Sequence, residues 1–143
     1  MWLGKQSAER MAQSQPDVGL VTISGDEAGV YTNLERRKVT SYAPGGYFWL
    51  PQEGENMLFV RTMHGEDCIA GAEQTARPPQ LQPGEVMVRS KDDAAHLWLR
   101  NNGTIEIKGN VSVAGSVSVS GSISATGTVS GAEGVYGGGN LLD

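Results

Sequence analysis

The sequence predicts an all-β protein in which a small N-terminal barrel precedes a short intertwined β-helix that three identical chains form together. Three observations lead to this fold class. Short strand-like runs alternate with turn signals in the first half of the chain, a proline-rich stretch follows, and the last third alternates apolar with polar residues and carries a glycine at every sixth position. Alternation with a period of two is typical of a β-strand with one buried face.

The barrel is predicted between Val18 and Gly71, where no helical periodicity of useful length occurs. Clusters of Gly, Pro, Asn and Asp separate the strand-like runs, as expected for turns. Five or six short strands suit a barrel of the OB type, which closes on itself and so hides its edges. The expected strands cover residues 18–24, 30–34, 39–42, 47–50, 57–61 and 68–70.

Residues 74–84 are predicted to be a linker, because Pro78, Pro79 and Pro83 stiffen the chain and prevent regular strand pairing. The expected organisation is an N-terminal lead at residues 1–14, an OB-fold domain at 15–73, this linker, and a β-helical domain with its tip at 85–143. Trp2 is the bulkiest residue of the lead, where docking onto a neighbouring subunit and a frayed terminus are equal alternatives.

The most informative pattern lies between Ile105 and Gly131, where every odd position is apolar or glycine and every even position except Ala114 is polar. A strict period of two over this length indicates one buried face and one wet face. Glycine on the inward row marks places where the backbone bends or closely approaches another backbone. The bend positions are Gly109, Gly115, Gly121 and Gly127, and the predicted trimer core is Ile105, Ile107, Val111, Val113, Val117, Val119, Ile123 and Val129.

Such a ribbon cannot bury its apolar face alone, and both of its edges carry unpaired N–H and C=O groups. A single-chain β-helix would have too few coils, since stacked repeats need roughly three or more units. Three chains wound round one axis pair every edge and point every odd residue at the axis. Because burying one Val or Ile contributes on the order of 1.5–3 kcal/mol, we expect a stiff homotrimer that resists heat and detergent.

Composition excludes several classes of protein. The net charge of −5 argues against a nucleic-acid partner or an anionic membrane surface, which require clustered Lys and Arg. Cys68 is the only cysteine, so no internal disulfide and no cysteine-based metal site is expected. The longest apolar runs are too short to cross a bilayer, and residues 1–6 lack the order of a secretory signal. We therefore expect assembly in the cytoplasm.

The segment from Leu81 to Lys108 resembles the start of the spike of Mu-like phages and, more broadly, the baseplate assembly protein V family. The resemblance depends on three motifs in fixed order, at residues 81–86 (LQPGEV), 96–99 (HLWL) and 102–107 (NGTIEI). Upstream, residues 42–47 (YAPGGY) and the segments that follow are similar to the OB domain of the same family. The resemblance covers roughly residues 15–131.

This resemblance implies a structural protein that is not an enzyme and needs no cofactor. Such proteins stand as trimers at the baseplate tip of a contractile tail. Their OB ring faces the tail-tube and baseplate hub proteins, and their β-helix points at the host. Sheath contraction drives the rod through the host outer membrane. The implied location is the tail tip of a phage virion or a phage-derived injection machine, with no nucleic acid among the partners.

The C-terminal residues depart from the family pattern. Many such spikes end in a His-x-His pair whose three copies hold an iron ion, whereas residues 134–143 contain no histidine. No iron site is therefore expected at the apex. The alternatives are a blunt tip, a separate tip protein, or closure by Tyr136, Leu141 and Leu142 packed on the axis.

Other residues that carry functional chemistry in proteins favour ordinary structural roles here. His64 and His96 have no further histidine at metal spacing and support no catalytic triad. Residues 91–93 (KDD) lack the Gly and Glu of an EF-hand and indicate a solvated turn, as does the basic run at 36–38. Residues 47–49 (YFW) are expected in the barrel core, since no basic groove accompanies them for stacking on nucleic-acid bases.

Two other classes of protein compete with the spike. A hexapeptide-repeat acyltransferase is also trimeric, but the repeats here are too few and no histidine lies in or after them. A trimeric adhesin stalk would require a secretion signal and a membrane anchor, and we expect neither.

Overall fold

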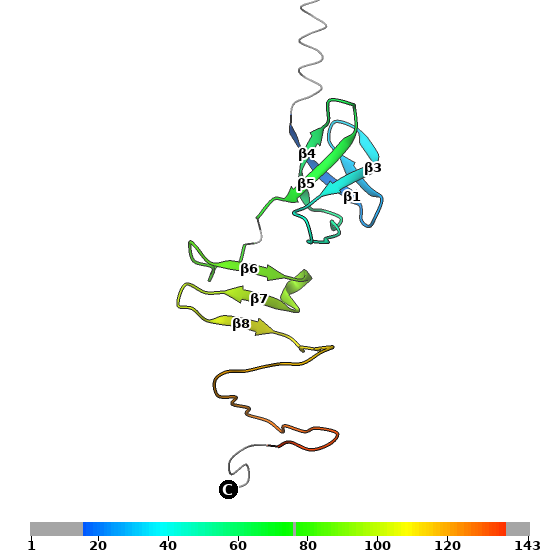
Figure 1. Ribbon diagram of the computed structural model, residues 1–143. Helices are drawn as coiled ribbons and strands as arrows, with labels where there is room; N and C mark the ends of the chain where they lie inside the picture. The colour runs from blue at the N-terminus through cyan, green and yellow to red at the C-terminus, as the bar shows by residue number, and fades with distance from the viewer. Residues whose placement is uncertain (1–15, 76, 137–143) are drawn as a thin grey trace, which may run out of the picture. The chain divides into compact units, whose positions relative to one another are not determined.

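The computed structural model describes residues 16–75 and 77–136 of the chain. These residues form eight β-strands and one short 3₁₀-helix, and no α-helix occurs among them (Figure 1). The protein is therefore all-β in its described part, as predicted. The chain divides into two compact units, residues 1–80 and residues 81–143.

The first unit is a closed five-stranded barrel (Figure 1). Its strands are β1 (Asp17–Ile23), β2 (Ala28–Tyr31), β3 (Glu35–Tyr42), β4 (Asn56–Arg61) and β5 (Asp67–Ala72). Neighbours follow the order β1-β2-β3-β5-β4, and antiparallel pairing of β1 with β4 closes the barrel. Only β3 and β5 pair in parallel within it. This architecture is compatible with the expected OB-like barrel.

The barrel core consists of apolar side chains contributed by all five strands. Alternate residues of a strand face the interior, as Met57 and Phe59 of β4 do. Trp49, from the loop between β3 and β4, packs against this core while remaining partly exposed. The buried cluster is Val21, Ala28, Val30, Val39, Met57, Phe59 and Ile69.

The predicted strand at residues 47–50 is wrong. These residues belong to a loop, which a turn from the Tyr47 N–H to the Pro44 carbonyl opens. The reason is topological: β3 already pairs with β2 and β5, and β4 with β1 and β5, so the closed barrel offers no edge for another strand. The expected core position of residues 47–49 is also wrong for Tyr47 and Phe48, both of which are exposed.

The basic run at residues 36–38 is not a turn but part of β3. Arg36 lies with its guanidinium carbon 5.0 Å from the centre of the Phe59 ring and its Nη1 3.3 Å from Asp67 Oδ2. A register irregularity between β2 and β3 accompanies the positive φ of Lys38, whose side chain is exposed. Only part of the basic run is therefore solvated, because Arg36 covers the core.

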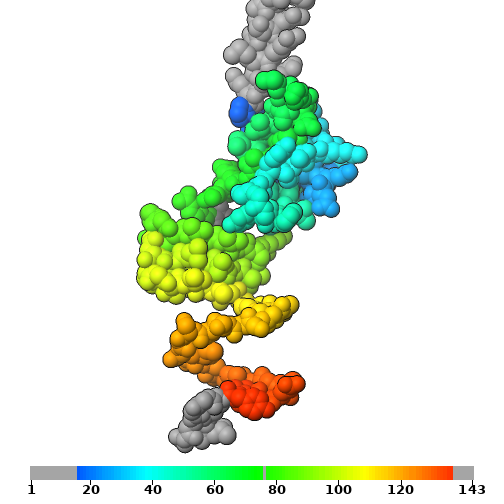
Figure 2. All heavy atoms as spheres, viewed as in Figure 1, coloured from blue at the N-terminus to red at the C-terminus, as the bar shows by residue number. Residues whose placement is uncertain are grey.

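The second unit begins with a three-stranded antiparallel sheet of β6 (Val86–Arg89), β7 (His96–Leu99) and β8 (Ile105–Lys108). The 3₁₀-helix η1 (Lys91–Asp93) lies in the connection between β6 and β7. Residues 109–136 follow the sheet, and we call them the ribbon. They contain no β-strand, and their backbone runs back and forth in successive passes (Figures 1 and 2).

Shortening a core side chain tests the barrel. Ile69 is fully buried, so Ile69→Ala should destabilise the barrel by about 2–5 kcal/mol through lost burial and the cavity that remains. Hydrogen exchange of residues 17–72 in a urea series measures this change. Leu58→Ala removes an exposed leucine of the same sheet and should cost less than about 1 kcal/mol; equal losses in the two variants would contradict the assigned inward face.

Candidate self-association surface

One face of the β6-β7-β8 sheet carries only aliphatic side chains. Residues that lie directly opposite each other in antiparallel strands point to the same face. The register pairs Leu99 with both Val86 and Ile105, and it pairs Leu97 with both Val88 and Ile107. We call these six side chains the apolar sheet face. All six are exposed in the single chain, Leu97 least at 40% and Ile105 most at 62%.

The opposite face of the sheet is covered by side chains of the same chain. Trp98 lies at its centre and is buried. The guanidinium carbon of Arg100 lies 4.0 Å from the centre of the Trp98 ring, a cation–π contact. Trp98 Nε1 donates a hydrogen bond of 3.0 Å to Glu85 Oε2. The two faces therefore differ. Side chains of the same chain cover the tryptophan face, whereas the apolar sheet face stays exposed.

The turn before β6 holds this arrangement together through Glu85. Its carboxylate accepts hydrogen bonds from the backbone N–H groups of Gln82 and Asn101 and from Trp98. These bonds, with that from Gln82 first, hold the pKa of Glu85 below its usual value. Gly84 has a φ of +92°, and a Cβ there would lie 3.1 Å from Asn101 Oδ1. The motif at residues 83–85 thus needs its glycine for the turn and its glutamate for the sheet.

A second polar cluster joins η1 to β7 and β8. Asp93 Oδ1 lies 2.7 Å from His96 Nδ1, and Asp93 Oδ2 accepts a hydrogen bond of 2.9 Å from Lys108 Nζ. These two partners, Lys108 first, lower the pKa of Asp93 to about 2. His96 Nε2 is buried and forms no hydrogen bond within the described structure, although Glu106 Oε1 lies 3.5 Å away. The expected solvated turn at residues 91–93 therefore also ties the sheet together.

The eight predicted trimer-core residues are divided between the sheet and the ribbon. Ile105 and Ile107 are in β8, on that face. The other six predicted core residues lie in the ribbon. In the single chain all eight side chains are between 48% and 77% exposed. They are Ile105, Ile107, Val111, Val113, Val117, Val119, Ile123 and Val129.

The ribbon bends at regular intervals. Bends occur at residues 109, 114–115, 120–121 and 126–127, so each of the four glycines of the repeat lies at one. Gly109 has a φ of +117°, and a Cβ there would lie 3.2 Å from that of Ala95, so both conformation and space require glycine. At Gly115, Gly121 and Gly127 a Cβ would meet nothing within 4 Å apart from the adjoining residues. No close contact in the described part of the chain therefore explains glycine at these three bends.

The backbone of the ribbon also forms few hydrogen bonds with other backbone groups of the described residues. Within its described residues, 109–136, the one backbone–backbone hydrogen bond joins the Gly134 N–H to the Gly131 carbonyl. A row of unpaired N–H and C=O groups is a template for pairing with another strand. The ribbon therefore presents an uncovered apolar row and unpaired edges together.

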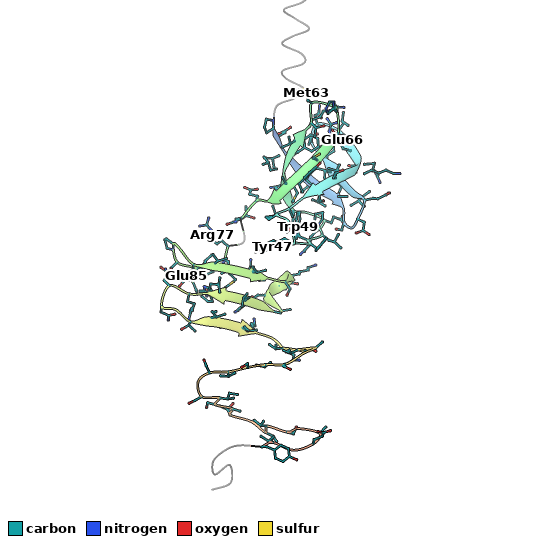
Figure 3. The ribbon with its side chains drawn as sticks, viewed as in Figure 1. Tyr47, Trp49, Met63, Glu66, Arg77 and Glu85 are labelled. Atoms are coloured by element: carbon teal, nitrogen blue, oxygen red, sulfur yellow. The ribbon has the colours of Figure 1, made fainter. Side chains whose placement is uncertain are left out.

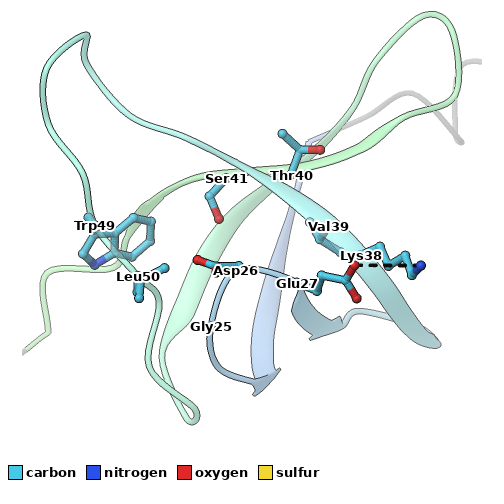
Figure 4. Close-up of a pocket in the computed structure, with 9 residues that line it drawn as sticks. All are labelled: Gly25, Asp26, Glu27, Lys38, Val39, Thr40, Ser41, Trp49 and Leu50. Atoms are coloured by element: carbon cyan, nitrogen blue, oxygen red, sulfur yellow. Dashed lines mark ion pairs between the residues drawn. The ribbon is translucent and has the colours of Figure 1, made fainter.

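The two histidines of the chain lie in separate strands and turns. Among the described residues, no group of three His, Cys, Asp or Glu side chains is placed to hold a metal ion. His64 lies in the β4–β5 turn, far along the chain from His96 in β7. A hollow of about 460 Å³ on the barrel contains the exposed Lys38–Glu27 ion pair, with Nζ and Oε1 3.9 Å apart (Figure 4). It holds no histidine or cysteine.

Four members of the apolar sheet face were not predicted as core residues: Val86, Val88, Leu97 and Leu99. Each strand is only four residues long, so each carries two inward positions, too few to establish a period. The sequence signal that identifies them is the alternation of Val or Leu with other residues in segments 86–89 and 96–99, when the two segments are considered together.

Of the predicted tip residues, Tyr136 is exposed and its hydroxyl donates a hydrogen bond to the Glu133 carbonyl, whereas Leu141 and Leu142 lie outside the described residues.

No protein-family model matches the chain, and no curated protein matches it. In the part of the chain that the structure describes, no helix is sufficiently long and apolar to span a membrane.

The Asp93 cluster predicts acid sensitivity of the sheet. The pKa of Asp93 is lower in the folded chain, at about 2, than its ordinary value of 3.8. Its contribution to stability is therefore complete above pH 3.8 and is lost as the pH falls towards 2. Hydrogen exchange of residues 86–108 over this pH range should show the loss. Asp93→Asn should remove much of the dependence, whereas Asp92→Asn should preserve it; the same pH dependence in both variants would contradict the assignment.

Proposed function

We propose that this chain forms a homotrimeric, non-enzymatic spike that pierces the host outer membrane from the tail tip of a contractile phage or a phage-derived injection machine. The observation that carries the proposal is the series of exposed aliphatic side chains that begins with Ile105 and Ile107 on the sheet and recurs along the sequence of the ribbon to Val129.

Three copies are favoured because one arrangement of three ribbons both buries the apolar side chains and pairs the backbone edges. Winding three ribbons round an axis buries the odd side chains, pairs each edge with the next chain and brings backbones together at the glycine bends. The bare surroundings of Gly115, Gly121 and Gly127 support such an approach by other chains. The tryptophan face of the sheet then faces outward, where Arg100 and Glu85 already cover it.

Function as a spike follows from mechanics and from resemblance. A rod without free edges and with an apolar axis resists bending and unfolding, as a piercing device must. The fixed order of the motifs at residues 81–86, 96–99 and 102–107 resembles the baseplate assembly protein V family. By that resemblance, the barrel is the part that meets the tail-tube and hub proteins, and a separate tip protein is a further partner. We propose no cofactor and no catalytic step.

Charge placed on the inward row tests the trimer. Val117→Asp would bring three carboxylates together on the axis, where desolvation and mutual repulsion oppose assembly. The SDS-resistant trimer of the unmodified chain should be lost. Ser118→Asp adds the same charge on the neighbouring outward row and should leave the trimer intact on the same gel. A stable Val117→Asp trimer, or equal loss in both variants, would contradict the odd-inward register.

Location tests the function itself. Antibodies against the barrel, applied to contractile particles from the cell that encodes this chain, should label the distal end of the tail in electron micrographs. Particles from a strain without the chain are the matched control and should be unlabelled. Trimers that occur only outside such particles would contradict the piercing function while leaving the trimer itself in place.

A further inference from the structure

We propose that Phe48 on the barrel of one copy docks into an apolar hollow on the barrel of a second copy, so that the barrels form a ring. This inference rests on the proposed trimer and adds a second contact between its chains, one formed by barrel residues and by none of the ribbon.

The docking group is an aromatic side chain without cover. The loop between β3 and β4 presents Phe48 at 100% exposure, with Tyr47 and Leu50 also exposed on either side. A phenylalanine contributes most when it is buried, and grouped exposed apolar side chains mark interaction sites. Trp49 of the same loop packs against the barrel core, so the loop is anchored while Phe48 remains free.

The hollow that would receive Phe48 includes Trp49, the next residue of the same loop. A hollow of about 320 Å³ is lined by residues 42–44, Trp49, Ala70 and Gly71, none of which is charged. Phe48 of the same chain does not fill it, since that side chain is fully exposed. A Cβ added at Gly71 would meet nothing within 4 Å, so the space above β5 is open. The hollow therefore suits an aromatic ring that comes from outside the chain.

A second copy fits this surface better than an unrelated protein. The docking side chain and its hollow are two different patches on one barrel, which defines a head-to-tail contact that closes into a ring under threefold rotation. Near a threefold axis each copy contacts both neighbours. Phe48 and the hollow can therefore lie close together on one barrel and still contact different copies. The site is also small: a stable interface between free proteins uses roughly 20–30 residues on each side.

Tethering removes the need for a large interface. The last barrel strand ends at Ala72 and β6 begins at Val86, so the linker joins each barrel to the part of the chain that we propose to trimerise. Modules joined by short linkers meet at effective concentrations of about millimolar. A contact of one aromatic ring in a hollow is then populated within the trimer although it would not hold two separate barrels together.

Cross-linking between two marked chains tests this contact. A long, tagged form with Tyr47→Cys and a short form with Ala70→Cys are coexpressed and treated with a short bis-maleimide, so that a mixed conjugate reports the proposed contact. Both positions are exposed, and Phe48 remains in both chains. Cys68 reacts slowly because burial raises the pKa of its thiol. The matched control replaces Tyr47→Cys by Met63→Cys, which is 96% exposed and lies at the other end of the barrel (Figure 3).

The expected yield of the mixed conjugate is roughly tenfold or more above the Met63→Cys control. Adding Phe48→Asp to both chains should reduce it to the control level while the mass remains that of three chains. A three-chain mass with control-level conjugate, or with conjugate that survives Phe48→Asp, would overturn this inference and leave the proposed spike standing. A single-chain mass would overturn both.

Discussion

The constraint on which the second unit depends is that its aliphatic row stays exposed in the single chain and that the ribbon pairs with no strand in the described residues. Burial of aliphatic side chains is the main favourable contribution to folding, yet from Ile105 to Val129 the predicted core residues stay exposed in the single chain. Hydrogen bonds do not compensate, because the ribbon pairs with no strand of its own chain in the described residues. In the proposed trimer, other copies of the chain supply both the cover for these side chains and the partners for these hydrogen bonds.

In the proposed assembly, the three-stranded sheet is the part of the second unit whose shape a single chain fixes by itself. Glu85 and Arg100 cover one face around Trp98, and Asp93 joins His96 at the start of β7 to Lys108 of β8. The sheet therefore holds its shape through polar contacts on one side and leaves the other side for association. Ile105 and Ile107 belong both to this face and to the predicted trimer core, so in the proposed trimer the sheet sets the register in which the ribbon begins. The barrel has its own core and a closed set of edges, so it needs no partner for its fold.

Features that repeat along the sequence were predictable from it. Features that depend on how the barrel closes, or on contacts between residues distant in sequence, were not. The all-β class and the barrel followed from turn residues and short apolar runs. The apparent strand at residues 47–50 failed because a closed barrel has no free edge, a property of the whole topology. Arg36 was assigned to solvent because its contacts, Phe59 and Asp67, are distant in sequence. Val86, Val88, Leu97 and Leu99 were missed because two inward positions per strand establish no period. The core assignment of the ribbon remains a prediction, since its partners are other chains.

The most direct test is the solution mass of the purified full-length chain, measured by light scattering, together with its migration on unheated SDS gels. The account predicts a mass near three times 15.1 kDa and a trimer band that survives SDS. A mass near 15.1 kDa at all concentrations would contradict it, because a single chain leaves the odd row uncovered and the ribbon without a fold.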